Sequence, residues 1–253
     1  MKPITTKQRA GLQQVITTIH RRWGAEALRP LGEQRGAGDA AGITTGLPVL
    51  DDLLGPNGLP RGSLTQFTGS PTSGVTTLAL KLAAAIQQHD EPVIYLDPCC
   101  TLDPGYAARC GVDPERLLLV RPPTLAAGMN IASDLITLGG SGLLVLDGMA
   151  CPPGDTLQNS GFQVALRRLA ARLPGSAWAL LCLTPPARVR LAAACAVPAA
   201  VRLRVEKLGW IRNGHDIQGY DVCITVIKDR HGAPGRQGVM AITFDELVQG
   251  DST

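Results

Sequence analysis

The residues best suited to chemistry lie in a glycine-bounded turn between an apolar strand-like stretch and a helix-like run. Gly69 and Gly74 are separated by four residues, and hydroxyl side chains follow at Thr76 and Thr77. This spacing matches the pattern G-x-x-x-x-G-K-[ST], in which backbone N–H groups at the start of a helix hold phosphate oxygens. The sequence therefore predicts a phosphate-binding loop formed by Gly69, Ser70, Pro71, Thr72, Ser73, Gly74, Val75, Thr76 and Thr77.

The loop departs from this pattern at one position, because Val75 stands where the lysine belongs. That lysine supplies the positive charge that meets the β- and γ-phosphates of a bound nucleotide. The spacing thus predicts the shape of the loop without its charge. Two interpretations follow: the loop binds ATP weakly, or Val75 packs on the core and the pocket is empty.

A carboxylate follows an apolar strand-like run farther along the chain. The run Leu143–Leu146 is followed by Asp147, and a carboxylate at this place in a phosphate-loop protein holds Mg²⁺ directly or through water. A buried strand can also end in aspartate because the side chain caps a helix. Together with the loop, the pattern predicts Thr76 and Asp147 as the magnesium ligands.

Composition and length bound the class of protein. The chain has 253 residues, of which 45% are hydrophobic, which suffices for one large α/β domain or one domain with a small appendage. No apolar run resembles a signal peptide or a membrane span, so we expect a cytoplasmic protein with no membrane partner. The seven cysteines lack C-x-x-C spacing and predict buried or half-buried thiols.

Strand and helix patterns alternate through most of the chain. Strands are expected at 63–68, 92–97, 117–120, 142–147 and 177–183, and helices at 76–88, 103–110, 126–138 and 162–173. Several strands are apolar on both faces, which is typical of a parallel sheet covered on both sides. The tail from 201 to 244 predicts further strands that extend this sheet at one edge.

The N-terminal part has a different pattern. Residues 7–23 read as an amphipathic helix, and a Gly/Ala-rich stretch follows at 32–42. We therefore expect an N-terminal helical arm and linker at 1–36 and a core domain at 37–253. The arm either packs on its own core or docks on a neighbouring copy, which would make a homo-oligomer.

Several segments, in order, resemble the bacterial RecA recombinase family. Leu96–Ala107 resembles the family's D-A-E-H-A-L-D-P-x-Y-A stretch, Ile43–Gly46 and Gly58–Gly62 resemble its lead-in to the phosphate loop, and Val226–Arg230 resembles a late strand. A counterpart of the family's C-terminal domain is not expected. The resemblance implies an α/β P-loop NTPase: a RecA-like three-layer α/β/α fold with a mostly parallel central sheet.

The resemblance also implies roles for individual residues. Asp103 and Tyr106 would face the adenine, and Lys228 and Arg230 would reach the nucleotide of a neighbouring protomer. Cys99 stands where the family has the glutamate that positions the attacking water. The family's γ-phosphate-sensing glutamine corresponds to a position near Pro185. Since each lost charge costs about 3 kcal/mol of transition-state stabilisation, negligible ATP turnover is expected.

Two segments match the loops through which RecA-like proteins bind single-stranded DNA, Met149–Gly161 and Thr184–Ala200. The second contains Arg188 and Arg190 but no aromatic residue for base stacking, so we expect a modest electrostatic footprint. A helical face with Arg167, Arg168 and Arg172 could add to it. The alternative is that Arg188 and Arg190 lie on the solvated face of a short helix.

The resulting hypothesis is a non-catalytic RecA-like paralogue, a pseudo-ATPase in DNA repair and the SOS response. It would bind single-stranded DNA, a RecA-like recombinase or a repair polymerase, with ATP and Mg²⁺ as weak ligands. One alternative is an ATP-dependent recombinase in which another cation replaces the missing lysine. Another is an interaction module unrelated to DNA.

Overall fold

The computed structural model describes residues 14–19, 21–22, 42–56, 58–150, 160–230 and 232–244. The chain divides into two units, Met1–Asp39 and Ala40–Thr253, which are considered separately. In the first unit, residues 14–19 and 21–22 are helical and fall within the expected arm. The remainder of the expected arm and the linker lie outside the described residues.

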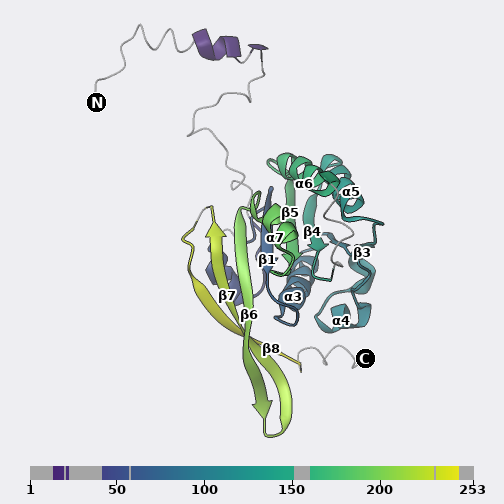
Figure 1. Cartoon of the computed structure of the whole chain (residues 1–253), viewed down its shortest axis with the longest axis vertical. Coiled ribbons are helices and arrows are strands. Elements are labelled where there is room, and N and C mark those ends of the chain that lie inside the picture. The colour runs from purple at the N-terminus through teal and green to yellow at the C-terminus, as the bar shows by residue number, and fades with distance from the viewer. Residues whose placement is uncertain are drawn as a thin grey trace, which may run out of the picture. The chain divides into compact units, whose positions relative to one another are not determined.

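The second unit is built on one eight-stranded sheet, shown in Figure 1. The neighbours from β3 to β6 pair in parallel, and β7 and β8 add antiparallel strands beyond β6, so the predicted extension at one edge is confirmed. In spatial order the strands are β3 (Leu117–Val120), β2 (Val93–Leu96), β4 (Ser141–Asp147), β5 (Ala177–Thr184), β1 (Ser63–Thr68), β6 (Val201–Asn213), β7 (Asp216–Asp229) and β8 (Gln237–Thr243).

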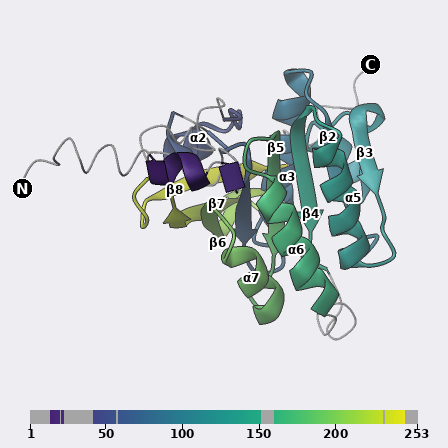
Figure 2. The ribbon, with the colours of Figure 1, turned by 90° about the horizontal axis from the view of Figure 1, so that it is seen from above.

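Helices cover both faces of the sheet, which confirms the predicted three-layer α/β/α fold. One buried hydrophobic cluster joins the sheet to α2 (Pro48–Leu54), α3 (Val75–Gln88) and α4 (Pro104–Arg109). A second cluster joins the other face to α5 (Leu125–Thr137), α6 (Ser160–Arg172) and α7 (Val189–Ala196), the three helices that lie side by side in Figure 2. A 3₁₀ turn at Pro114–Arg116 precedes β3.

The two segments expected as DNA-binding loops have different outcomes. Residues 151–159 of the first lie outside the described residues. The second contains the helix α7, because its alanine-rich sequence has high helix propensity and Leu191 and Cys195 are buried on one side. Arg190 consequently lies on a helix, as in the alternative considered from the sequence.

The helices begin in two different ways. Asp103 caps α4 by accepting a hydrogen bond from the Gly105 N–H at 2.8 Å, and Thr124 caps α5 similarly through Ala127. By contrast, Gly74 precedes α3 with a φ of 93° and provides no side-chain cap. The first N–H groups of α3 therefore lack a capping acceptor and can bind an external ligand.

The antiparallel strands hold side chains against the phosphate-loop segment. The β6–β7 ribbon projects beyond the rest of the sheet in Figure 1, and β8 pairs with its base through Tyr220 and Ile242. A Cβ atom added at Gly74 would lie 2.9 Å from Ile242 Cδ1 and 3.3 Å from the Tyr220 ring. The base of the ribbon thus packs directly on the turn that precedes α3.

We expect Gly219→Ala to destabilise the protein, because its added Cβ would collide with the carbonyl oxygen of Ile242 in the paired strand. A loss of about 2 kcal/mol or more in the free energy of unfolding is expected from such backbone overlap. Chemical denaturation measures it. Gly209→Ala, whose Cβ meets nothing within 4 Å, is the matched control on β6; equal effects of the two changes would contradict the prediction.

Candidate nucleotide site

The predicted phosphate loop joins β1 to α3 in a strained backbone conformation. Thr72 has a φ of 66° and Gly74 a φ of 93°. A β-branched residue at positive φ costs about 1–3 kcal/mol and persists only where the surroundings hold it. The Ser73 N–H donates to the Ser70 carbonyl at 3.1 Å, which closes the turn. The loop is therefore held in a curved conformation even though its lysine is missing.

Val75 packs into the core beside α3. Its side chain is 1% exposed and belongs to the same hydrophobic cluster as Leu78 and Phe67. A Cβ atom placed on Gly69 would lie 2.8 Å from Val75 Cγ2, so the valine also fills the space under the loop. Val75 contributes packing to this site and no charge.

Three hydroxyl groups meet at the first turn of α3. Thr77 Oγ1 lies 2.6 Å from the Tyr106 hydroxyl and 3.4 Å from that of Tyr220. Burial raises the pKa of Tyr106 to about 12, and burial also raises the pKa of Tyr220. Both phenols therefore stay protonated at neutral pH and link α4 and β7 to the helix that follows the loop.

Asp147 is held by two donors at the end of β4. Its side chain accepts a hydrogen bond from the Tyr95 hydroxyl at 2.7 Å and one from the Met149 N–H at 2.9 Å. Asp147 is 5% exposed, and this burial raises its pKa above the ordinary aspartate value. Burial likewise raises the pKa of Tyr95, so the phenol remains the donor.

Two cavities adjoin the loop and share three lining residues, Thr76, Tyr106 and Met149. The second, of about 310 Å³, also contains Asp103 and Asp147. A threonine hydroxyl and a carboxylate around one cavity are donors suited to Mg²⁺, which is bound by few protein oxygens and keeps several waters. The first cavity, of about 250 Å³, is lined by Ser70, Thr72, Ser73, Gly74, Val75, Thr76, Thr77, Tyr106, Met149, Lys207, Trp210, Tyr220 and Phe244.

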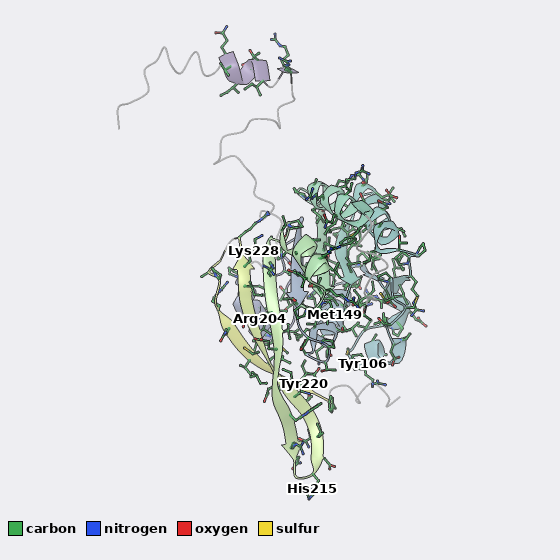
Figure 3. All side chains as sticks on the ribbon, viewed as in Figure 1. Tyr106, Met149, Arg204, His215, Tyr220 and Lys228 are labelled. Atoms are coloured by element: carbon green, nitrogen blue, oxygen red, sulfur yellow. The ribbon has the colours of Figure 1, made fainter. Side chains whose placement is uncertain are left out.

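The ribbon residues at this site had escaped the sequence reasoning. Figure 3 shows Tyr106, Met149 and Tyr220 grouped at the base of the ribbon, although they come from α4, the end of β4 and β7. Lys207 and Trp210 of β6 complete the group. Of the residues in this group, the sequence had indicated only Tyr106 as part of the nucleotide site, through the resemblance of its segment to the RecA family.

Cys99 lies in a turn that serves a structural purpose. Its side chain is half-buried and packs against the hydrophobic cluster on the face of the sheet opposite α3. The neighbouring Asp97 is fully buried and accepts hydrogen bonds from the Thr101 and Leu102 N–H groups at 3.0 and 3.1 Å. This turn provides no carboxylate at the position of the expected water-positioning glutamate.

The end of β5 is tied into a hydrogen-bond network. The Gln66 amide nitrogen donates to Thr184 Oγ1 at 2.8 Å and to the Ala192 carbonyl of α7 at 2.9 Å, and Arg202 donates to its oxygen. The following Pro185 is buried and has no donor in its side chain. The strand end that would carry a sensing glutamine instead anchors α7.

A larger cavity, of about 580 Å³, lies between α6 and α7 and is called the basic groove here. Its cationic lining consists of Arg167, Arg190 and Arg230, surrounded by small apolar side chains. Arg188 precedes α7 and does not line the groove, whereas Arg172 donates to Ser133 Oγ of α5 at 2.6 Å. The structure thus places three of the expected DNA- and protomer-contacting residues, Arg167, Arg190 and Arg230, around one groove and leaves Arg188 and Arg172 outside it.

Lys228 and Arg230 lie away from the phosphate loop of their own chain. Lys228 donates to the Val197 carbonyl at 3.4 Å, beside the basic groove, and Figure 3 shows it far from Tyr106 and Tyr220. Partial burial, followed by the charges of Arg230 and Arg202, lowers the pKa of Lys228. These two cations cannot serve the nucleotide site of the same protomer.

Comparison with known proteins agrees with the family that the sequence resembles and with the fold described above. A family model for the RecA N-terminal domain matches residues 10–177. The chain belongs to the RecA family. Protein RecA of Francisella tularensis subsp. novicida strain U112 is 29% identical over 267 residues, covering 96% of this chain and 74% of the relative, and Protein RecA of the subsp. tularensis strain SCHU S4 matches to the same extent.

A solved structure supports the RecA-like fold. The crystal structure of the RadB recombinase superimposes with a TM-score of 0.60 and 21% identity, covering 80% of this chain and 96% of that one. In the described part of this RecA-family chain, no cluster of three His, Cys, Asp or Glu side chains could hold a metal. Nor does any helix there have the length and apolarity needed to cross a membrane.

We expect Tyr95→Phe to destabilise this RecA-family chain by about 1–3 kcal/mol, because the buried Asp147 carboxylate loses a donor. Burial disfavours the charged form of Asp147, so its pKa in the folded chain lies above the ordinary aspartate pKa. The folded chain is therefore most stable at pH values below the ordinary pKa, where the side chain is protonated, and it loses stability as pH rises through the folded pKa. Removing the Tyr95 bond raises that pKa further. The loss should therefore be larger at neutral than at mildly acidic pH.

Urea denaturation at both pH values measures this difference. Asp147→Asn is the matched background, because the amide has no negative charge to stabilise. Tyr95→Phe should cost less there than in the unmodified chain. A cost that is independent of pH and of Asp147→Asn would contradict the assigned role of the Tyr95 hydroxyl.

Proposed function

We propose that this RecA-family chain works in DNA repair or recombination as a non-catalytic member that holds a nucleotide without hydrolysing it. It binds single-stranded DNA, a RecA-like recombinase or a repair-polymerase partner, and acts in the cytoplasm during the SOS response. The nucleotide is Mg-ATP, contacted by the loop N–H groups and by Thr76 and Asp147. The N-terminal arm would connect copies of the chain in a homo-oligomer.

One observation carries the proposal: the phosphate loop keeps its curved backbone while Val75 is buried in the core where the lysine belongs. A preorganised cation at a transferring phosphoryl group is worth about 3 kcal/mol, and none comes from this position. Cys99 and Pro185 remove the other two expected groups. Binding contacts therefore survive the loss of the groups that promote turnover.

The DNA part of the proposal rests on the basic groove. Arg167 lies on α6, Arg190 on α7 and Arg230 directly after β7, and none of the described residues that line the same cavity is a carboxylate. Guanidinium groups pair readily with phosphate oxygens, so a nucleic-acid backbone fits this chemistry. Small apolar side chains between the arginines provide no stacking platform, which favours backbone contacts without base readout.

The second candidate function is an ATP-dependent recombinase with a rewired phosphate site. It is favoured by Lys207, which brings a cation from β6 into the cavity at the loop. Hydrolysis would still require a group to activate water, and Cys99 is not placed to do so. ATP turnover distinguishes the two candidates.

We expect the purified protein to show no ATP turnover above background, with or without single-stranded DNA, because three contributing groups are absent. Phosphate release measures turnover. Val75→Lys should strengthen nucleotide binding without restoring hydrolysis, since Cys99 remains. The variant Asp147→Ala controls for contaminating ATPases: turnover stimulated by DNA and abolished in that variant would establish the recombinase alternative.

We expect Arg167→Ala combined with Arg190→Ala to weaken binding of a single-stranded oligonucleotide at low salt. Each lost phosphate contact should reduce the slope of log K against log salt by about 0.7. Fluorescence anisotropy across a salt series measures both quantities. Arg188→Ala tests whether the DNA contact lies in the groove or in the preceding turn. Arg116→Ala, at an exposed position, is the control. Equal losses of DNA affinity in all of these variants would contradict the proposal that the groove is the binding site.

A further inference from the structure

Among the described residues that line the cavity at the phosphate loop, Lys207 is the single formally charged side chain. The other lining residues are loop residues, hydroxyl-bearing side chains, aromatic rings and Met149. None of these described lining residues carries a carboxylate. A cation surrounded by donors and rings, without a carboxylate, is suited to an anionic ligand.

Lys207 reaches this place because β6 runs beside the loop. A Cβ atom on Gly69 would lie 2.5 Å from the Val205 carbonyl oxygen, so the strand backbone touches the first glycine of the loop. Two residues later, on the same face of the strand, Lys207 projects into the cavity. Arg204 and Glu206 lie on the other face and pair with each other at 3.5 Å.

Aromatic rings hold the ammonium group of Lys207. Its Nζ lies 2.8 Å from the ring centroid of Trp210 and 4.9 Å from that of Tyr220. Among the described residues, no carboxylate forms an ion pair with it. Desolvation lowers the pKa of Lys207 from its ordinary value. Ring faces position the charge without neutralising it, which leaves it able to meet an anion.

Two further observations indicate an anion at this position. Ser73 is 1% exposed and lines the cavity, and its Oγ is buried without a hydrogen-bond partner in the described structure. An unpartnered buried hydroxyl is costly and can donate to a ligand oxygen. The uncapped start of α3 adds backbone N–H groups with the positive end of the helix dipole.

We propose that Lys207 replaces the missing loop lysine and contacts the phosphate oxygens of a nucleoside di- or triphosphate. The charge comes from a neighbouring strand instead of from the first turn of α3, where Val75 now packs into the core. Lys207 is a binding residue in this role, and it restores affinity without restoring hydrolysis. The inference rests on the proposed nucleotide-holding function and identifies the residue that supplies the positive charge for phosphate binding.

The test measures binding of Mg-ATP and Mg-pyrophosphate to the full chain by isothermal titration. Lys207→Met should weaken both by about tenfold or more, since a charge-assisted contact is lost. Lys207→Arg should retain most of the affinity. Arg204→Met is the matched control, because it removes the same charge from the opposite face of the same strand and should leave binding unchanged.

Tryptophan fluorescence provides an independent readout. Movement of Lys207 from the Trp210 ring to a phosphate should change the emission on addition of either ligand, and Trp210→Phe should remove that change. Thermal unfolding of each variant establishes that it is folded. If Lys207→Met is unstable, Lys207→Gln keeps most of the side-chain length and tests the same loss of charge.

Equal affinity of the unmodified chain and the folded Lys207→Met or Lys207→Gln variant would overturn the inference, as would failure of both ligands to bind at millimolar concentration. An effect on ATP alone, without one on pyrophosphate, would also overturn it, because the contact would then be with the base or sugar. None of these results bears on DNA binding or on the absence of turnover. ATP hydrolysis would refute the proposed function while leaving a Lys207-dependent affinity intact.

Discussion

Packing between the base of the β6–β7 ribbon and the phosphate loop is the contact on which the candidate site depends. Gly74 meets the ring of Tyr220 and the side chain of Ile242, and Gly69 lies against the backbone of β6. A side chain at either glycine would push the ribbon away from the loop. Thr72, with a φ of 66°, lies in the same turn.

In this chain, the side chain that packs beside the core at the start of α3 and the cation at the loop are two different residues. A lysine at the start of α3 would give the loop both a charge and a flexible stem beside the core. Here Val75 takes the core position, and Lys207, a cation that lines the cavity at the loop, comes from a strand that is distant in sequence. The loop retains backbone donors, and the base of the ribbon closes one side of the cavity.

The sheet places the two chemical regions of the chain apart. The phosphate loop, Asp147 and Tyr106 gather where β1 and β4 end, whereas Arg190 and Arg230 face the basic groove between α6 and α7. The hydrogen bonds of Gln66 connect these regions, because they join the end of β5 to α7 and to Arg202. Gln66 is fully buried at this crossing.

The sequence by itself determined the alternating strands and helices, the loop between β1 and α3, the missing lysine and the membership of the RecA family. These follow from local patterns, because spacing and hydrophobic periodicity act over a few residues. Thr76 and Asp147, which the sequence predicted as magnesium ligands, line one cavity, since the carboxyl ends of parallel strands share a side of the sheet. Only the tertiary structure decided that Lys207, Trp210 and Tyr220 line the cavity at the loop. It also decided that Arg190 and Arg230 line one groove while Arg188 does not, and that Cys99 packs against the hydrophobic cluster on the face of the sheet opposite α3. Those relations depend on how the twisted β6–β7 ribbon and the helix α7 pack across the sheet, and no local pattern encodes contacts between residues so far apart in the chain.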